Sequence, residues 1–329
     1  MSFHRVTVFG GSGFIGRYVV ERLADRDAVI AVAVRDPEAA KSLRVAGQVG
    51  QISPIAANIR DPESIRAAVA GADSVVNLCG VLAESGRQTF QAVHVDGAAN
   101  IARAAAAAGA ERLIHVSAIG AGDSATSKYA RSKAAGERAV REAFPGATIL
   151  RPSVVFGPED SFFNLFAGIS RATPALPLFG GGTTKFQPVY VCDVAAAIVA
   201  ALDDDSAHGQ VYELGGPEMY TFRELMQKML QVIRRRRLLV PLPYLVGDIQ
   251  ATIMDIQWAV LRFFFGGLVP NPPLTRDMMR QLRVDNVVAP GARTLADLGV
   301  VPTSLNAVLP AYLARYRRGG RFGLQALTQ

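Results

Sequence analysis

The chain has 329 residues, of which 50% are hydrophobic and 19% are charged. This composition excludes a mainly disordered chain, because disorder requires low hydrophobicity and high charge, and the length suits two domains or one two-lobed protein. Two cysteines, Cys79 and Cys192, are too few for a disulfide framework or a multi-cysteine zinc site, so no metal site is expected.

The net charge of +7 is concentrated in the C-terminal third. Residues 1–222 hold 20 basic and 22 acidic side chains, whereas residues 223–329 hold 15 basic and 6 acidic. A local excess of this kind favours an anionic membrane surface or an acidic partner, and no nucleic-acid partner is expected. The chain enters a strand-like run at once, so no presequence is expected. It contains no uncharged apolar run of about 18 residues, so no membrane-spanning helix is expected.

Short apolar runs alternate with helical patterns through the first half of the chain. Strands are expected at 6–9, 29–34, 52–57, 75–78, 113–117 and 148–151. Helices are expected at 18–24, 37–45, 62–69, 92–108 and 127–142. Repeated strand–helix units of this kind predict an α/β fold of the Rossmann type, in which helices cover both faces of a doubly wound parallel sheet.

After Pro152 the pattern becomes irregular and rich in glycine and proline. A strand at 189–191 and a helix at 194–201 are expected to return to the first lobe. We therefore assign 1–156 and 186–202 to a Rossmann-type domain. The remaining ranges, 157–185 and 203–329, are assigned to a smaller C-terminal α/β lobe, which includes a short strand at 211–214 and a helix at 222–233 capped by Thr221.

A glycine motif, Gly10-x-x-Gly13-x-x-Gly16, separates the first expected strand from the first helix. Its glycines permit a tight turn and let the backbone approach a pyrophosphate at the positive end of the helix. In this position the motif predicts a dinucleotide site more strongly than a plain turn, so the Rossmann domain at 1–156 and 186–202 is expected to be NAD(P)-binding. The expected contacts are Gly10, Gly11, Ser12, Gly13, Phe14, Ile15, Gly16 and Arg17.

The end of the second expected strand distinguishes the two nicotinamide cofactors. An acidic residue there would bind the ribose hydroxyl of NAD, but this chain has Arg35, whose guanidinium suits the 2′-phosphate of NADP. NADPH is therefore favoured over NADH, against the alternative that Arg35 is a solvated loop residue. Asp61 is expected either to contact the adenine or to cap the helix that follows it.

A second group of polar residues follows the fifth expected strand. Ser117 ends that strand, and Tyr129 and Lys133 share one face of the next helix. In hydride transfer to a carbonyl, the phenol would donate a proton, the ammonium would lower the phenol pKa, and the serine would orient the carbonyl. Asn100 is the expected member of a proton relay. The alternative is an ordinary helix face, and present-day catalysis is a separate question from cofactor binding.

Two other kinds of residue receive simpler interpretations. Cys79 is expected to be a small buried residue beside the cofactor cleft rather than a reactive thiol. The four histidines lack ligand-like spacing and are expected to be structural or to lie on the surface: His4, His94, His115 and His208.

The most unusual segment is 234–270, which begins with four consecutive arginines, Arg234 to Arg237. Its other charges, Asp248, Asp255 and Arg262, recur every seven residues and would form a narrow polar stripe on a helix. The apolar residues would then leave a wide face that docks into a membrane interface or a partner, or covers the core of the second lobe. These residues are Leu245, Ile249, Ile253, Ile256, Trp258, Val260, Leu261 and Phe263 to Phe265. Arg315, Arg317, Arg318 and Arg321 add to the partner-facing interpretation.

With these residues in view, the chain resembles an extended or atypical short-chain dehydrogenase/reductase over nearly its whole length. The resemblance is carried by the glycine turn, Asn77-Leu78-Cys79-Gly80, Ser117, Tyr129-x-x-x-Lys133, Arg151-Pro152-Ser153-Val154 and Gln187 to Asp193. It implies that Leu78, Cys79, Gly80, Pro152 and Val154 join the cofactor contacts. Within that superfamily the chain is most similar to the dinucleotide-binding accessory subunits of respiratory complex I, the alpha subcomplex subunit nine family. The motifs that carry this similarity are 11–20, 129–137, 143–145, 156–160 with 163–164, and 274–277.

This resemblance implies a tightly held NADPH, a place at the peripheral arm of complex I (NADH:ubiquinone oxidoreductase) near the membrane surface, and a structural or assembly role. The expected absence of a presequence favours a bacterial protein on the cytoplasmic side of the inner membrane, as a peripheral membrane protein. Two alternatives remain open. One is a free NADP-dependent reductase, epimerase or dehydratase, and the other is a redox-sensing regulator that binds the cofactor without chemistry.

Overall fold

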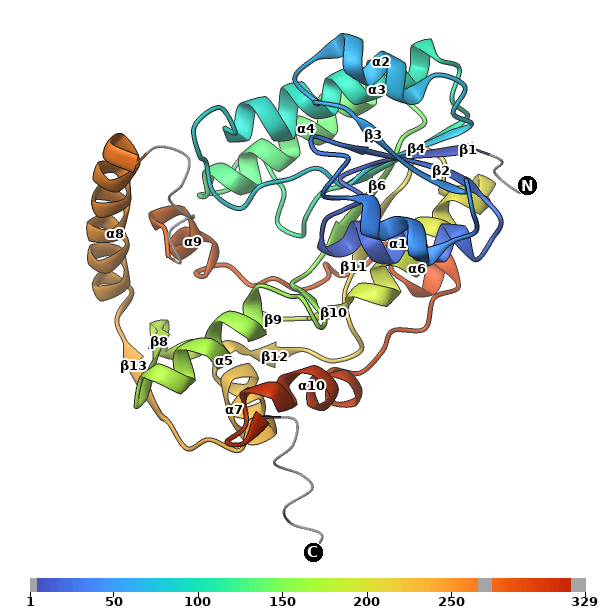
Figure 1. Cartoon of the computed structure of the whole chain (residues 1–329). Coiled ribbons are helices and arrows are strands. Elements are labelled where there is room, and N and C mark those ends of the chain that lie inside the picture. Colours follow the sequence, from blue (N-terminus) through green and yellow to red (C-terminus); the bar gives the residue numbers. More distant parts are fainter. Residues whose placement is uncertain (1–4, 266–273, 321–329) are drawn as a thin grey trace, which may run out of the picture. The chain divides into compact units, whose positions relative to one another are not determined.

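The computed structural model of this protein describes residues 5–265 and 274–320, and it divides the chain into two compact units (Figure 1). The first unit is built from three stretches of chain: the N-terminal stretch, which ends at Pro152, then Val191–Leu214, and then Val288–Val301. The second unit takes the intervening stretches, Ser153–Tyr190 and Gly215–Val287, and the chain from Pro302 onward.

The centre of the first unit is a seven-stranded parallel sheet with the order β11-β6-β5-β4-β1-β2-β3. Its strands are β1 (Arg5–Phe9), β2 (Val29–Val34), β3 (Ile52–Ala56), β4 (Ser74–Asn77), β5 (Arg112–Val116), β6 (Thr148–Pro152) and β11 (Val211–Leu214). The strand order runs outward in both directions from β1 and β4, which is the doubly wound arrangement that the alternation predicted. The predicted fold class is confirmed.

Helices cover both faces of this sheet. They are α1 (Phe14–Ala24), α2 (Pro62–Val69), α3 (Gly97–Ala107), α4 (Lys128–Ala143) and α6 (Val191–Asp203). Figure 1 shows α1 and α6 on one face and α2, α3 and α4 on the other. Apolar side chains of strands and helices, such as Val75, Ile101, Leu113, Val140 and Ile149, form one buried cluster between the sheet and its second helical layer.

Two predicted elements differ from the structure in the first unit. The helix expected at 37–45 is wrong: Asp36 accepts hydrogen bonds from the backbone N–H groups of Glu38 and Ala39, which forms a turn, and only a 3₁₀ segment at Lys41–Ala46 follows. The long helix expected at 92–108 begins with a π-helical turn, Gln91–Asp96, and continues as α3.

The expected exchange of segments between the lobes also needs correction. Strand β11 was assigned to the second lobe, but it pairs in parallel with β6 and forms the edge of the central sheet. The strand expected at 189–191 is a two-residue strand, β10 (Val189–Tyr190), which pairs with β7 (Val155–Phe156) in the second unit. The partner of β6 lies about 60 residues downstream, so local pattern carried no signal for this pairing.

The second unit combines short strand pairs with helices around a phenylalanine-rich core. Its helices are α5 (Phe162–Ala172), α7 (Phe222–Val232), α8 (Tyr244–Phe265), α9 (Arg276–Gln281) and α10 (Leu305–Leu313). Strand β9 (Lys185–Phe186) pairs with β12 (Tyr220–Thr221), and β8 (Ala175–Phe179) pairs with β13 (Leu238–Leu242). The predicted cap is confirmed, because Thr221 and Glu224 form a capping box at the start of α7.

Candidate functional site

The glycine turn after β1 is shaped for close backbone contacts. Gly10 has a φ of +78°, which favours glycine, and its carbonyl accepts a hydrogen bond from Gly13 N–H at 3.0 Å. A Cβ on Gly16 would press against that same carbonyl oxygen and lie 2.5 Å from Gly11 Cα. The turn therefore requires glycine at both positions, as the dinucleotide motif predicted.

The N-terminus of α1 is available for an anion. Gly13 is its N-cap and offers no side-chain cap, and no acidic residue lies in the first turn. The free N–H groups and the helix dipole thus favour negative charge at this point. The turn also adjoins the exit of β4, because Leu78 N–H donates to Phe9 O at 3.0 Å. This is the point at which the strand order of the sheet reverses, where open α/β sheets bind ligands.

Arg35 follows β2 directly and is exposed. Gly10 N–H donates to the carbonyl of Ala33, so the end of β2 lies beside the glycine turn. The acidic residue that follows, Asp36, is engaged by the backbone N–H groups of Glu38 and Ala39. At the end of β2, the guanidinium of Arg35 is therefore exposed, whereas the carboxylate of Asp36 caps the turn that follows.

Around Lys133, a dense buried group connects the ends of β4 and β5 to α4. Lys133 is 5% exposed, and its Nζ donates to Val116 O at 3.2 Å. A Cβ on Gly80 would lie 3.2 Å from the same Nζ, so the segment after β4 passes directly over the ammonium. Ser117 is 3% exposed, and its hydroxyl finds no partner among the described residues. An unpaired buried hydroxyl costs free energy, and a ligand hydroxyl or carbonyl would satisfy it.

The segment after β4 is held by side chains beneath it. Asn77 Oδ1 accepts the N–H of Cys79 at 3.0 Å, and Asn77 Nδ2 lies 3.0 Å from His115 Nδ1. Burial raises the pKa of Cys79 to about 12, with Lys133 and Arg35 acting in the opposite direction. The thiol is therefore protonated at neutral pH, which agrees with the interpretation of Cys79 as an unreactive residue.

Tyr129 lies one helical turn before Lys133 on α4. Burial raises the pKa of the phenol to about 12, so the net shift is upward, and the lowering by Lys133 stays a prediction. The same burial that isolates the ammonium also disfavours the phenolate. The described residues therefore provide a protonated phenol, a donor of a hydrogen bond, rather than an activated acid.

His94 is buried and structural, one of its two expected roles, but its contacts beside the site were not predicted. Its Nε2 accepts the N–H of Val81 at 3.0 Å, and its Nδ1 lies 2.8 Å from Ser132 Oγ. Its ring stacks on Phe90 and meets Tyr129 edge-on at 5.5 Å between centroids. Burial, and then Lys133, lower the pKa of His94 to about 3, so the ring is neutral and fixes the segment after β4 to α4. The 38-residue separation from Ser132 left no local signal.

The remaining predicted site residues lie as follows. Asn100 donates to Ile59 O at 3.1 Å and accepts from Arg103, contacts that fix it beside the loop before α2. Asp61 is the N-cap of α2 and accepts from Glu63 N–H at 3.1 Å, the second of its two expected roles. Pro152 ends β6, and its carbonyl accepts the N–H of Ile119. Val154 belongs to the second unit.

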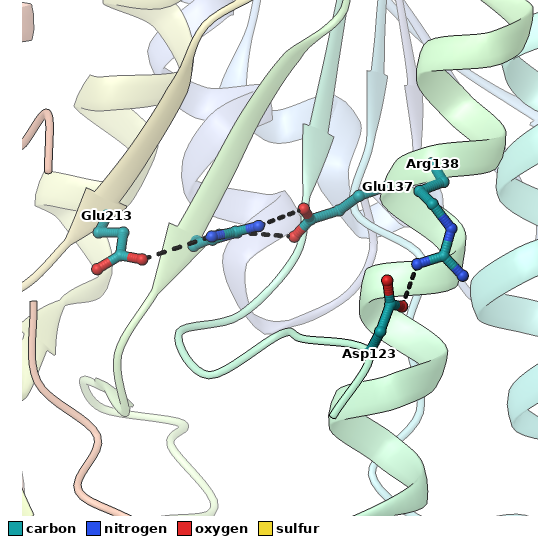
Figure 2. Close-up of polar contacts among 5 residues, drawn as sticks. Asp123, Glu137, Arg138 and Glu213 are labelled. Atoms are coloured by element: carbon teal, nitrogen blue, oxygen red, sulfur yellow. Dashed lines mark hydrogen bonds and ion pairs between the residues drawn. The ribbon is translucent and has the colours of Figure 1, made fainter. Parts of the chain in front are cut away.

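A buried ion pair supports α4 below Lys133. Arg151 on β6 donates to both carboxylate oxygens of Glu137, at 2.9 and 2.6 Å, and its guanidinium also lies 3.5 Å from Glu213 on β11. Figure 2 shows one guanidinium between Glu137 and Glu213. It also shows a separate ion pair, in which Arg138 of α4 contacts Asp123 in the loop before that helix. Glu213 in turn accepts the N–H of Ala289, so the ion pair also holds the third stretch of the first unit.

Lys133 makes the stability of the fold depend on pH. Burial lowers its pKa from 10.5 to about 8, against the raising effects of Glu137 and Cys79. Because the unfolded chain holds this proton more tightly, the free energy of unfolding increases as pH rises above about 8. We expect a gain of about 1 kcal/mol between about pH 8 and 9, measured by urea denaturation.

Lys133→Met should remove that gain, and an unchanged rise in this variant would contradict the assignment. The window ends near pH 9, because there the Cys79 thiol acts in the opposite sense: its pKa of about 12 in the fold, above its ordinary value of 9.0, makes stability fall as pH increases further.

The geometry of this site agrees with the comparisons. The family model of the NAD dependent epimerase/dehydratase family matches residues 6–215. The chain belongs to that family. The chain is also 40% identical to the mitochondrial NADH dehydrogenase [ubiquinone] 1 alpha subcomplex subunit 9 of Arabidopsis thaliana. The match covers 95% of this chain and 78% of that protein, so the chain belongs with the subunit 9 proteins.

Two further similarities define the breadth of this family. The chain is 31% identical to the ceramide reductase of Caulobacter vibrioides over 72% of its length and 73% of that protein. The crystal structure of gox2253 aligns with a TM-score of 0.72 at 22% identity, covering 97% of this chain and 99% of that one, which shows the shared fold. Among the described residues, no group of His, Cys, Asp and Glu is arranged to hold a metal, and no helix is long and apolar enough to span a membrane.

Proposed function

We propose that this family member is an accessory subunit of respiratory complex I that holds NADPH in its first unit and contributes structure rather than turnover. The observation that carries the proposal is 40% identity to a subunit 9 protein over 95% of the chain. The proposed partners are peripheral-arm and membrane-interface subunits of complex I. We place it on the cytoplasmic side of a bacterial inner membrane, as a peripheral protein.

The residues of the first unit support a bound dinucleotide. The glycine turn and the open N-terminus of α1 suit the pyrophosphate, and the unpaired hydroxyl of Ser117 with the ammonium of Lys133 suits the nicotinamide half. The exposed guanidinium of Arg35 supports NADPH over NADH, because Asp36 is already engaged by backbone N–H groups. When bound, the nicotinamide group supplies or accepts a hydride.

A structural role for the cofactor requires binding without turnover. Burial raises the pKa of Tyr129 to about 12, which makes the phenol a weaker proton donor to a substrate. Binding alone is sufficient to stabilise the subunit, because a ligand present at 100 times its dissociation constant adds about 2.7 kcal/mol to the free energy of unfolding. The bound NADPH would then strengthen the first unit without turning over.

Arg35→Ser should separate the two cofactors. Loss of a charged hydrogen bond to the 2′-phosphate costs about 1.5–3 kcal/mol, which corresponds to roughly 10- to 150-fold weaker NADPH binding. NADH binding should remain unchanged, and fluorescence titration of the purified chain measures both. Arg44→Ser, which removes another exposed arginine of the first unit, is the control. Equal losses for NADPH and NADH would argue against the 2′-phosphate contact.

Co-purification tests the accessory role. A tagged chain is expressed in its own host, membranes are solubilised in mild detergent at low salt, and the associated proteins and nucleotides are identified. We expect complex I subunits together with NADPH. A chain recovered without complex I subunits would refute the accessory role and leave the cofactor proposal standing.

The second candidate function is a free NADP-dependent reductase, epimerase or dehydratase. The ceramide reductase relative and the presence of Ser117, Tyr129 and Lys133 favour it. In that case Tyr129 would donate the proton that a reduced carbonyl oxygen receives, and Ser117 would orient that oxygen. Turnover of a carbonyl substrate that Tyr129→Phe abolishes while NADPH binding is retained would support this candidate. Equal turnover in the variant would oppose it.

A further inference from the structure

Seven arginines gather near the C-terminal end of α7 in the second unit. Four of them, Arg234 to Arg237, line an open hollow of about 720 Å³ together with Gln227, Leu230, Gln231 and Leu239. Burial, and then repulsion from Arg237, Arg318 and Arg171, lower the pKa of Arg235. The seventh, Arg317, donates from Nε to Val232 O at 2.8 Å. In residues 5–265 and 274–320, no carboxylate forms an ion pair with any of the seven.

The backbone positions several of these guanidinium groups. Arg235 Nε donates to Tyr316 O at 3.0 Å, and Arg237 Nε donates to Ser170 O at 2.7 Å. Arg317 uses Nε in the same way. Bonds through Nε fix the direction of a guanidinium and leave terminal nitrogens for a second acceptor, and phosphate oxygens match that geometry. Arg237 uses one terminal nitrogen, Nη1, on Arg236 O at 2.9 Å. Backbone carbonyl groups therefore fix the orientation of three guanidinium groups in the arginine cluster.

Arg234 occupies a backbone conformation that favours glycine. Its φ is +53°, and it ends α7 through two hydrogen bonds, from its own N–H to Gln231 O and from Arg235 N–H to Leu230 O. This is the Schellman arrangement, in which glycine is the usual residue at the left-handed position. An arginine at this point carries a conformational cost that glycine avoids, and costs of this kind cluster at functional positions.

Exposed aliphatic side chains follow the arginines along the chain. In β13, Leu238 and Val240 are exposed, and Leu238 retains 70% of its surface. In α8, one exposed face carries Leu245, Ile249, Ile253 and Ile256 at intervals of three or four residues. Figure 1 shows α8 extending beyond β13 and approaching α9.

The opposite face of α8 explains how it is attached. Ala251 is fully buried in a small cluster with Phe179 and Met279, and a Cβ on Gly247 would lie 2.9 Å from the Phe179 ring. The acidic residues of the predicted polar stripe contact α9 and its flank: Asp248 pairs with Arg283, and Asp255 accepts from Arg276 N–H. The helix thus covers its own core with small residues and leaves its larger aliphatic residues outside. Residues 266–270 of the predicted docking segment, Arg321, and the side chains of Val260, Arg262 and Phe263 to Phe265 lie outside the described residues.

We propose that the arginine cluster binds the phosphates of anionic phospholipids, while the exposed aliphatic residues of β13 and α8 enter the interfacial layer of the same membrane. Charge complementarity and the adjoining apolar side chains carry the inference, because phosphate groups bordered by hydrocarbon are characteristic of a lipid surface and not of a nucleic-acid backbone. This inference deepens the proposed placement at the membrane, but it requires no contact with complex I.

Vesicle binding by the purified full-length chain tests the proposal. We expect sedimentation with vesicles that contain phosphatidylglycerol and not with vesicles of phosphatidylcholine alone, and we expect added salt to weaken the binding. Arg234→Gly combined with Arg236→Gln should weaken binding about 30-fold, since each arginine near an anionic surface contributes about fivefold. Because glycine relieves the left-handed position, the Tm of Arg234→Gly alone should be equal to or above that of the unmodified chain.

The control is the double variant Arg44→Gln with Arg141→Gln, which removes the same charge from exposed positions of the first unit. It should bind vesicles nearly as well as the unmodified chain. Equal losses in both double variants, or no binding to anionic vesicles, would overturn the proposal. Binding of duplex DNA that the Arg234 and Arg236 changes abolish, without vesicle binding, would reassign the cluster to nucleic acid. None of these results depends on complex I, so co-purification tests the accessory role separately.

Discussion

Gly16→Ala should destabilise the first unit by about 3 kcal/mol or more and eliminate measurable NADPH binding. The added methyl group would meet backbone atoms of the glycine turn, at 2.5 Å from Gly11 Cα and 2.7 Å from its carbonyl carbon. Backbone atoms of a packed turn cannot rotate away as a side chain can, so the turn or α1 must shift. Urea denaturation measures the loss of stability, and fluorescence titration measures the loss of binding.

Gly168→Ala is the matched control, because the same change is made inside helix α5 where a Cβ meets no atom within 4 Å. Alanine is favoured over glycine in a helix by about 1 kcal/mol, so this variant should be slightly more stable. Similar losses in the two variants would mean that the close approach of Gly16 to the turn is not what limits stability.

Arg151→Met should cost about 3–5 kcal/mol of the free energy of unfolding. The change leaves two carboxylates without their cation, and the side chains of Glu137 and Glu213 are only 6% and 12% exposed. An unpaired buried charge is far more costly than the loss of an exposed pair. Urea denaturation at pH 7 measures the difference.

The comparison is with Arg138→Met, which breaks the other ion pair in Figure 2. In that pair Arg138 and Asp123 are 54% and 69% exposed, so the expected cost is about 0–1 kcal/mol. A large loss in Arg138→Met, or a small one in Arg151→Met, would contradict the role of Arg151 as the cation that compensates two buried carboxylates.

Local pattern was sufficient for the elements whose partners are near in sequence. The first six strands and the glycine turn follow from periodicity and turn chemistry. The structure places the glycine turn after β1 and Ser117 after β5, with Tyr129 and Lys133 on α4. Parallel strands linked by helices have few alternative arrangements, so the doubly wound class follows from the alternation, whereas the order of the strands comes from the structure.

Pattern failed where distant contacts decide the outcome. The membership of β11 in the sheet depends on β6, and the role of His94 depends on Ser132 and Val81. The sequence indicates that Tyr129 and Lys133 share one helix face, but only the structure shows that burial raises the pKa of the phenol. The helix expected at 37–45 failed for a local reason, the capping side chain of Asp36.

The three-part construction of the first unit has a consequence for biosynthesis. Its sheet is complete only when β11 has been made, and the buried Glu213 obtains its hydrogen bond from Ala289 only later. The nascent unit therefore exposes the edge of β6 while more than fifty intervening residues are translated, and unpaired edges of this kind invite association. We expect the emerging chain to depend on chaperones during this interval, and truncation shortly before Val211 to yield an aggregating product rather than an isolated cofactor domain.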